Sequence, residues 1–153
     1  MDGEVNLGAI TTGSAGETPL DELAAEITDI ASRVNVVSYR WLVLIAEFDR
    51  RQGWAAAGAR SCAHWLHWRC GLDLGAAREK VRVAHALARL PLIAAAMASG
   101  ELSYSKVRAL TRVACAANEV QLLAAARQST AHHLETLVRQ YRRTQELAEL
   151  NRE

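Results

Sequence analysis

Apolar residues recur at steps of three and four over residues 20–48. They are Leu20, Leu23, Ile27, Ile30, Val34, Val37, Trp41, Leu44 and Phe48. Such steps place side chains on one face of an α-helix, so the pattern predicts a single helix of about 30 residues, on the order of 45 Å long. A helix of this length needs a partner for its apolar face. We expect it either to fold back on the C-terminal helices or to pair with a second copy of the chain as a homodimer.

Residues that cap or stop helices divide the rest of the chain into shorter segments. Four residues of the types that favour helix N-caps precede apolar stretches: Ser61, Asp73, Ser103 and Thr130. The expected helices run from Ser61 to about Cys70, Asp73 to Leu90, Leu92 to Ser99, Ser103 to about Ala116, Asn118 to Gln128, and from Thr130 onward. No segment alternates apolar and polar residues as a half-buried strand does. The sequence predicts an all-α fold of about seven helices, with the long N-terminal helix packed on a helix-turn-helix-like bundle.

Length and composition fit one domain. The 153 residues are half apolar and only 5% aromatic, which favours closely packed helices. Residues 1–19 are predicted to be a disordered leader, and residues 20–150 a single helical domain. No run of about 18 apolar residues is present, so we expect no membrane span. The three cysteines, in a chain without a secretion signal, are interpreted as reduced and mainly buried thiols of a cytoplasmic protein.

The net charge of +1 hides a strong asymmetry along the chain. Residues 1–59 contain 4 Lys/Arg and 9 Asp/Glu, whereas residues 60–112 contain 9 Lys/Arg and 3 Asp/Glu. An anionic partner can bind a local basic patch whatever the net charge of the whole chain. The near-neutral net charge therefore does not exclude nucleic-acid binding. An acidic N-terminal helix that packs beside the basic segment would partly neutralise it.

The expected helix Asp73–Leu90 carries a stripe of basic side chains. At 100° per residue, four of them fall within a sector of about 60°: Arg78, Arg82, His85 and Arg89. A second strip follows at similar spacing: Ser105, Arg108 and Arg112. We interpret these seven residues as candidate contacts to double-stranded DNA, since arginine makes paired hydrogen bonds to phosphate or guanine. Six charges on phosphates predict a log–log salt slope of roughly −5. The alternative is an ordinary solvated helix face.

The layout of the two helices on either side of Gly71 matches a helix-turn-helix. A short helix over residues 61–70, a glycine turn and a second helix would place the second helix in the major groove. Arg78 and Arg82 would then lie best for base edges or phosphates, and Arg89 for the backbone.

No motif in the sequence predicts catalysis or a metal site. Cys62 and Cys70 are separated by about 12 Å along a helix axis, so only His67 and Cys70 could share an ion, which is too few ligands for a structural zinc site. We found no nucleophile–base arrangement, no glycine-rich phosphate loop and no paired carboxylates. We therefore expect no enzyme activity, no cofactor and no metal.

Two segments of the chain resemble a known protein family. They read SCAHWLHWRCGLDLGAAREKVRVAHALARLPLIAAAMASGELSYSKVRALTRV and STAHHLETLVRQYRR. Together they closely resemble the actinobacterial 13E12 repeat family, also called domain of unknown function DUF222, over about residues 20–150. In that family the helical domain commonly precedes an HNH nuclease module, which implies a DNA-handling context. No segment suited to that module remains before Glu153, so the chain resembles a truncated or separated N-terminal domain without nuclease activity.

A more distant similarity concerns the basic segment alone. GLDLGAAREKVRVAHALARLP followed by ASGELSYSKVRAL is similar to the central DNA-binding region of ParB-type partition proteins. The comparison implies that residues 73–90 match the recognition helix, with Arg78 and Arg82 on its exposed side. Two functional hypotheses remain: a non-catalytic DNA-binding module, or a helical oligomerisation or protein-interaction domain that does not bind DNA.

Overall fold

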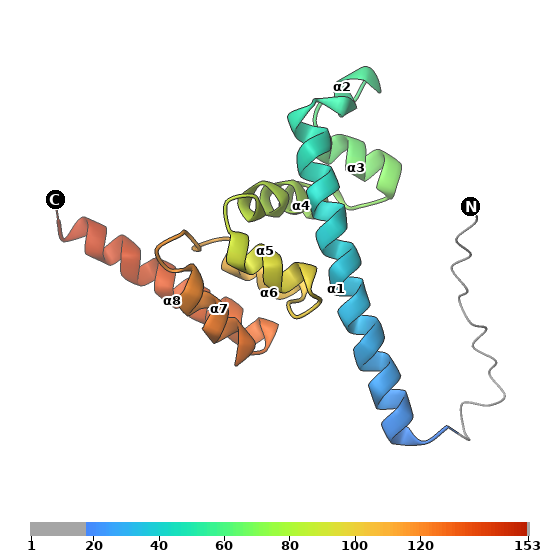
Figure 1. Cartoon of the computed structure of the whole chain (residues 1–153). Helices are drawn as coiled ribbons and strands as arrows, with labels where there is room; N and C mark the ends of the chain where they lie inside the picture. Colours follow the sequence, from blue (N-terminus) through green and yellow to red (C-terminus); the bar gives the residue numbers. More distant parts are fainter. Residues whose placement is uncertain (1–17, 153) are drawn as a thin grey trace.

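The computed structural model describes residues 18–152, which form eight helices and no strand (Figure 1). The helices are α1 (Leu20–Arg50), α2 (Gly53–Ala56), α3 (Cys62–Cys70), α4 (Leu74–Leu87), α5 (Pro91–Ala98), α6 (Tyr104–Leu110), α7 (Glu119–Arg127) and α8 (Ala131–Leu150). The all-α prediction is confirmed. One helix more than expected is present, because residues 53–56 form the single turn α2 between the first two predicted helices. The predicted leader lies almost wholly outside the described residues.

Helix α1 has the predicted length, but its predicted apolar face meets the bundle only toward its C-terminal end, where Trp41 and Phe48 pack on the core. Leu42 and Ile45 are buried, whereas Ile27, Val34 and Val37 of the predicted apolar face are exposed. Among the described residues, α1 contacts α2 to α6 and does not contact α7 or α8. The expectation that it folds back on the C-terminal helices is therefore wrong.

Side chains cap four helices at the positions predicted from sequence. The hydroxyl of Ser61 accepts from the backbone N–H of His64, and the carboxylate of Asp73 accepts from Gly75. Ser103 and Thr130 accept in the same way at the starts of α6 and α8. Such caps satisfy N–H groups that have no partner within the helix, and they fix where each helix begins.

Helix α4 lies at the centre of the bundle and contacts α1, α3, α5 and α6. Its inner side is built from small and branched residues, with Ala77 and Val83 fully buried. Because alanine adds little bulk, neighbouring helices approach α4 closely, and only part of its surface remains free. The buried core continues through Ile93, Met97 and Leu110 of α5 and α6.

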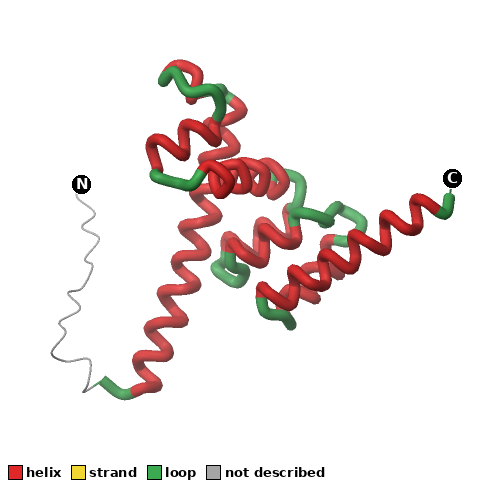
Figure 2. The backbone as a smooth tube through the Cα atoms, turned by 180° about the vertical axis from the view of Figure 1, so that it is seen from behind, coloured by secondary structure: helices red, strands yellow, loops and turns green. Residues whose placement is uncertain are grey.

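The two ends of the described chain project from this bundle as arms (Figure 2). One arm is the N-terminal half of α1, and the other is the C-terminal half of α8, beyond Val138. Helix α8 is held to the bundle mainly by α6. No described helix has both the length and the apolar composition to cross a membrane alone. Helices α4 and α5 have the required length and composition only when taken together, and this pair is bent by 115°.

The cysteines differ from the expectation that most are buried. Cys62 lies in the core, where burial raises the pKa of its thiol to about 11. Cys70 and Cys115 are exposed. The periodicity of α3 places Cys70 at the helix end, past the last residue that reaches the core.

Candidate nucleic-acid interface

The carboxylate of Glu79 on α4 forms ion pairs with three guanidinium groups. The Nε of Arg82 lies 2.9 Å from Oε1 of Glu79. The Nε of Arg108 on α6 and the Nη2 of Arg112, in the turn after α6, lie 2.7 Å and 3.0 Å from Oε2. The cluster therefore joins α4 to α6 and carries a net charge of +2.

The carboxylate of Glu79 stays ionised to low pH. Hydrogen bonding from Arg82 is the main cause that lowers its pKa from 4.5 to about 2, and Arg108 adds to it, while partial burial acts in the opposite direction. Ion pairing with the same carboxylate raises the pKa of Arg108. All three arginines therefore keep their positive charge around a fixed negative centre.

Arg82 is held more tightly than its two neighbours. Its Nη1 donates to the hydroxyl of Thr111 at 3.3 Å, and its Nη2 donates to the carbonyl oxygen of Arg108 at 3.2 Å. With the bidentate pair to Glu79, most of its donors are occupied within the protein. Arg82 thus supplies charge to this region and has few donors left for base edges.

The predicted stripe of Arg78, Arg82, His85 and Arg89 is not one free surface. His85 faces the opposite flank of α4, where its Nε2 lies 2.6 Å from Oδ2 of Asp49 on α1. Arg89 lines a hollow beside Thr111 of α6. Arg78 is exposed. The stripe is divided because α1 and α6 pack on opposite flanks of α4, so the expectation of four outward side chains without internal partners is wrong for Arg82 and His85.

The second predicted strip lies beside α8. Arg108 and Arg112 line a hollow of about 190 Å³ together with Glu135 and Arg139 of α8. Ser105 is exposed one turn earlier on α6. The two helices thus present arginines to a shared depression.

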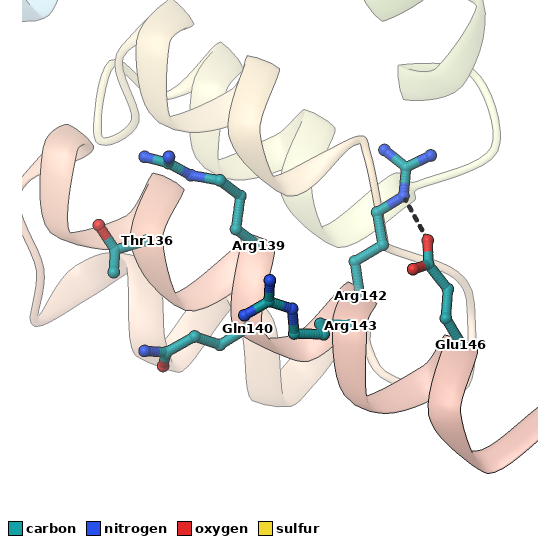
Figure 3. A pocket seen from close by; sticks show the side chains of 6 residues that line it. All are labelled: Thr136, Arg139, Gln140, Arg142, Arg143 and Glu146. Carbon is teal, nitrogen blue, oxygen red and sulfur yellow. Dashed lines mark ion pairs between the residues drawn. The ribbon is translucent and has the colours of Figure 1, made fainter.

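Helix α8 extends this positive surface along its own axis. Figure 3 shows Arg139 and Arg143 one turn apart and Arg142 next to Arg143 in the chain, with the ion pair from Arg142 to Glu146 dashed. Sequence reasoning missed Arg139 and Arg143. The signal was present in the run RQYRR, since Arg139 and Arg143 lie on the side of α8 away from the buried Leu134 and Val138.

We define the basic face as five arginines: the three of the Glu79 cluster, Arg139 of the α6–α8 hollow, and Arg143, which lines an adjoining depression on α8 together with Arg139. They are Arg82, Arg108, Arg112, Arg139 and Arg143. Two carboxylates, of Glu79 and Glu135, lie among them. The face therefore carries a net charge of +3 at neutral pH, concentrated on one side of three helices.

The two lysines among residues 60–112 contact groups inside the bundle and are not part of the basic face. The Nζ of Lys80 lies 3.4 Å from the ring centroid of Tyr104 and 4.9 Å from that of Trp41, and burial lowers its pKa. The Nζ of Lys106 donates to the carbonyl oxygen of Ala126 at 2.7 Å. Their ammonium groups thus bind the bundle together.

Both histidines of α3 form hydrogen bonds with residues close to them in the sequence. His67 Nδ1 lies 2.6 Å from the carbonyl oxygen of Leu72, and His64 Nδ1 lies 2.7 Å from the hydroxyl of Ser61. Within residues 18–152, no three His, Cys, Asp or Glu side chains come together as metal ligands would.

Comparison with known proteins gives one match. The family model described as a domain of unknown function (DUF222) matches residues 21–152, which include every helix except the first residue of α1. No curated protein matches the chain, and no solved structure does.

Proposed function

We propose that this chain, which belongs to the family of the domain of unknown function DUF222, is a non-catalytic module that binds the phosphate backbone of double-stranded DNA. The observation that carries the proposal is the basic face, where Arg108, Arg112 and Arg139 line one hollow and the first two also bind the Glu79 carboxylate of α4. Guanidinium groups fixed on several rigid elements suit successive phosphates, because each planar fork pairs with two phosphate oxygens.

The geometry favours backbone contacts over base reading. A recognition helix inserts its exposed N-terminal side chains into the major groove, whereas α4 is enclosed by four helices and Arg82 is bonded internally. Arg139 and Arg143 have no ion-pair partner among the described residues, and their guanidiniums are available to an anion. We therefore expect binding with little dependence on DNA sequence.

Salt dependence gives the first test. A net charge of +3 that contacts about three phosphates predicts a log–log slope of about −3, which is an affinity loss of roughly 60-fold between 50 and 200 mM salt. This replaces the steeper slope expected from six free charges. Fluorescence anisotropy of a labelled duplex, titrated with the full chain over a salt series, measures the slope.

A matched pair of double variants tests the location. Arg139→Ala with Arg143→Ala removes two charges of the basic face, so the slope should fall to about −1 and the affinity by about tenfold. Arg51→Ala with Arg60→Ala removes the same charge beside α2, at the end of the bundle away from α8 (Figure 1). This control should bind DNA within about twofold of the unchanged chain. Equal losses in the two double variants would reject the assignment to the basic face.

The resemblance to the 13E12 repeat family supports the choice of DNA as the anionic polymer. Its helical domain commonly precedes an HNH nuclease module. A domain that binds DNA independently of sequence would hold such a module close to its substrate. Duplex RNA, tested in the same titration, separates DNA binding from binding of any polyphosphate. Equal affinity for both duplexes would contradict a DNA-directed function.

A further inference from the structure

The exposed stripe of α1 has the period of a coiled coil. Its apolar residues alternate steps of four and three without interruption from Leu23 to Phe48, which is the seven-residue repeat that two supercoiled helices share. Ile27, Val34 and Trp41 occupy one position of the repeat, and Ile30 and Val37 belong to the other.

The stripe is uncovered between Ile27 and Val37, whereas Trp41 and Phe48 are half-buried against the bundle. Ile27 and Val37 are each 68% exposed, and Ile30 is 50% exposed. The bundle touches this half of α1 from another side, where Ser32 and Asn35 donate to the carbonyl oxygen of Gly100. A long row of exposed apolar side chains at helical spacing marks an interaction surface.

We infer that α1 pairs with α1 of a second copy of the chain as an antiparallel coiled coil over residues 20–44. In this register Ile27 lies opposite Val37 of the partner subunit, and Ile30 lies opposite Val34 of the partner subunit. Leu23 lies opposite Trp41 of the partner subunit, whose ring is only half-exposed because it also packs against its own bundle. The overlap of 25 residues is about 37 Å long. Small residues flank the seam on one side, which allows the helices to approach: Ala24, Ala31 and Ser38.

The charges that flank the seam select this arrangement. The flanking positions on the other side hold Glu26, Arg33 and Arg40. Glu26 and Arg40 have no ion-pair partner among the described residues, and the antiparallel register places Glu26 beside Arg40 of the partner subunit, twice per dimer. Arg33 lies at the two-fold axis, opposite Arg33 of the partner subunit. Its charge is compensated within its own chain by Asp29, at 2.8 Å.

A parallel pair is disfavoured by the same residues and by the shape of the molecule. It would place Glu26 beside Ala31 of the partner subunit, so the unpaired charges would stay unpaired. It would also bring both helix bundles to the same end of the coiled coil. The antiparallel pair sets the bundles at opposite ends of α1, since the bundle packs on its C-terminal half (Figure 1).

Sedimentation equilibrium of the full chain tests the inference. We expect a dimer mass at micromolar concentrations. Ile30→Glu with Val37→Glu should raise the dissociation constant by more than about a hundredfold, because two charges from each subunit would enter the apolar seam. Val120→Glu is the matched control: Val120 on α7 is 67% exposed, as exposed as Val37, and lies outside the seam. It should leave the dimer intact.

Charge reversal tests the orientation. Glu26→Arg alone and Arg40→Glu alone each create two like-charged pairs, so each should raise the dissociation constant by about tenfold. The double variant Glu26→Arg, Arg40→Glu restores opposite charges and should return to within about threefold of the unchanged chain. Far-UV circular dichroism should stay the same throughout, because all these positions are exposed. A monomer at tens of micromolar, or a dimer indifferent to the reversals, would overturn the inference.

Discussion

Replacing Glu79 with glutamine removes the charge on which three guanidiniums of the basic face converge. The pKa of about 2 against an ordinary 4.5 corresponds to at most about 3 kcal/mol of stabilisation at neutral pH, since one pKa unit is worth about 1.4 kcal/mol. The side chain is 22% exposed, and solvent screening reduces the contribution to about 2 kcal/mol. We expect Glu79→Gln to lower the free energy of unfolding by that amount at pH 7.

The pH dependence of this loss has a defined sign. The pKa of Glu79 is depressed by folding, so its stabilisation is complete above the ordinary value of 4.5 and is lost as the pH falls toward 2. Urea denaturation of both proteins at a series of pH values measures the difference. The gap should be constant above pH 4.5 and close below it. A gap that persists at pH 2 would refute the role given to the carboxylate charge.

The same substitution should act in the opposite direction on DNA binding. Removing the negative centre raises the net charge of the basic face from +3 to +4, so the salt slope should steepen by about one and affinity at low salt should rise by about three- to tenfold. Glu101→Gln is the charge-matched control, because Glu101 pairs with Arg127 of α7 outside the basic face. Unchanged or weaker DNA binding by Glu79→Gln, or an equal gain from Glu101→Gln, would refute the reasoning.

Three further substitutions test the fold that holds the basic face. Gly100→Ala should destabilise by about 1–3 kcal/mol, because Gly100 has a φ of +89° and an added Cβ would lie 2.8 Å from the carbonyl oxygen of Ser32; urea denaturation measures the loss. Leu110→Ala should cost about 3 kcal/mol in the same assay, since Leu110 is fully buried beneath the basic face. Ser61→Ala should cost about 1 kcal/mol through the lost cap of α3, seen as a lower midpoint of thermal unfolding.

The local features of this fold were readable from its sequence. The caps at Ser61, Asp73, Ser103 and Thr130 follow from short-range rules, since each side chain reaches an N–H two or three residues away. The length of α1 followed from its periodicity for the same reason. Periodicity alone did not reveal how α1 meets the bundle, because Ser32 and Asn35, which contact Gly100, lie outside the apolar stripe.

The candidate site depended on contacts distant in the sequence. The pair between Arg82 and Glu79 is one helical turn apart, but the approach of Arg108 and Arg112 to the same carboxylate requires α6 to pack on α4. A helical wheel places His85 with the arginines, whereas α1 brings Asp49 to it. Arg139 joins the face only because α8 packs on α6.

The most direct test of DNA binding by the basic face maps the contact residue by residue. Amide chemical shifts of the labelled chain, recorded by nuclear magnetic resonance while duplex DNA is added, report which helices the DNA touches. We predict changes concentrated in α6 and α8 around Arg108 and Arg139, with little change at the turn between α3 and α4. Changes centred on that turn, or none at saturating DNA, would contradict the account.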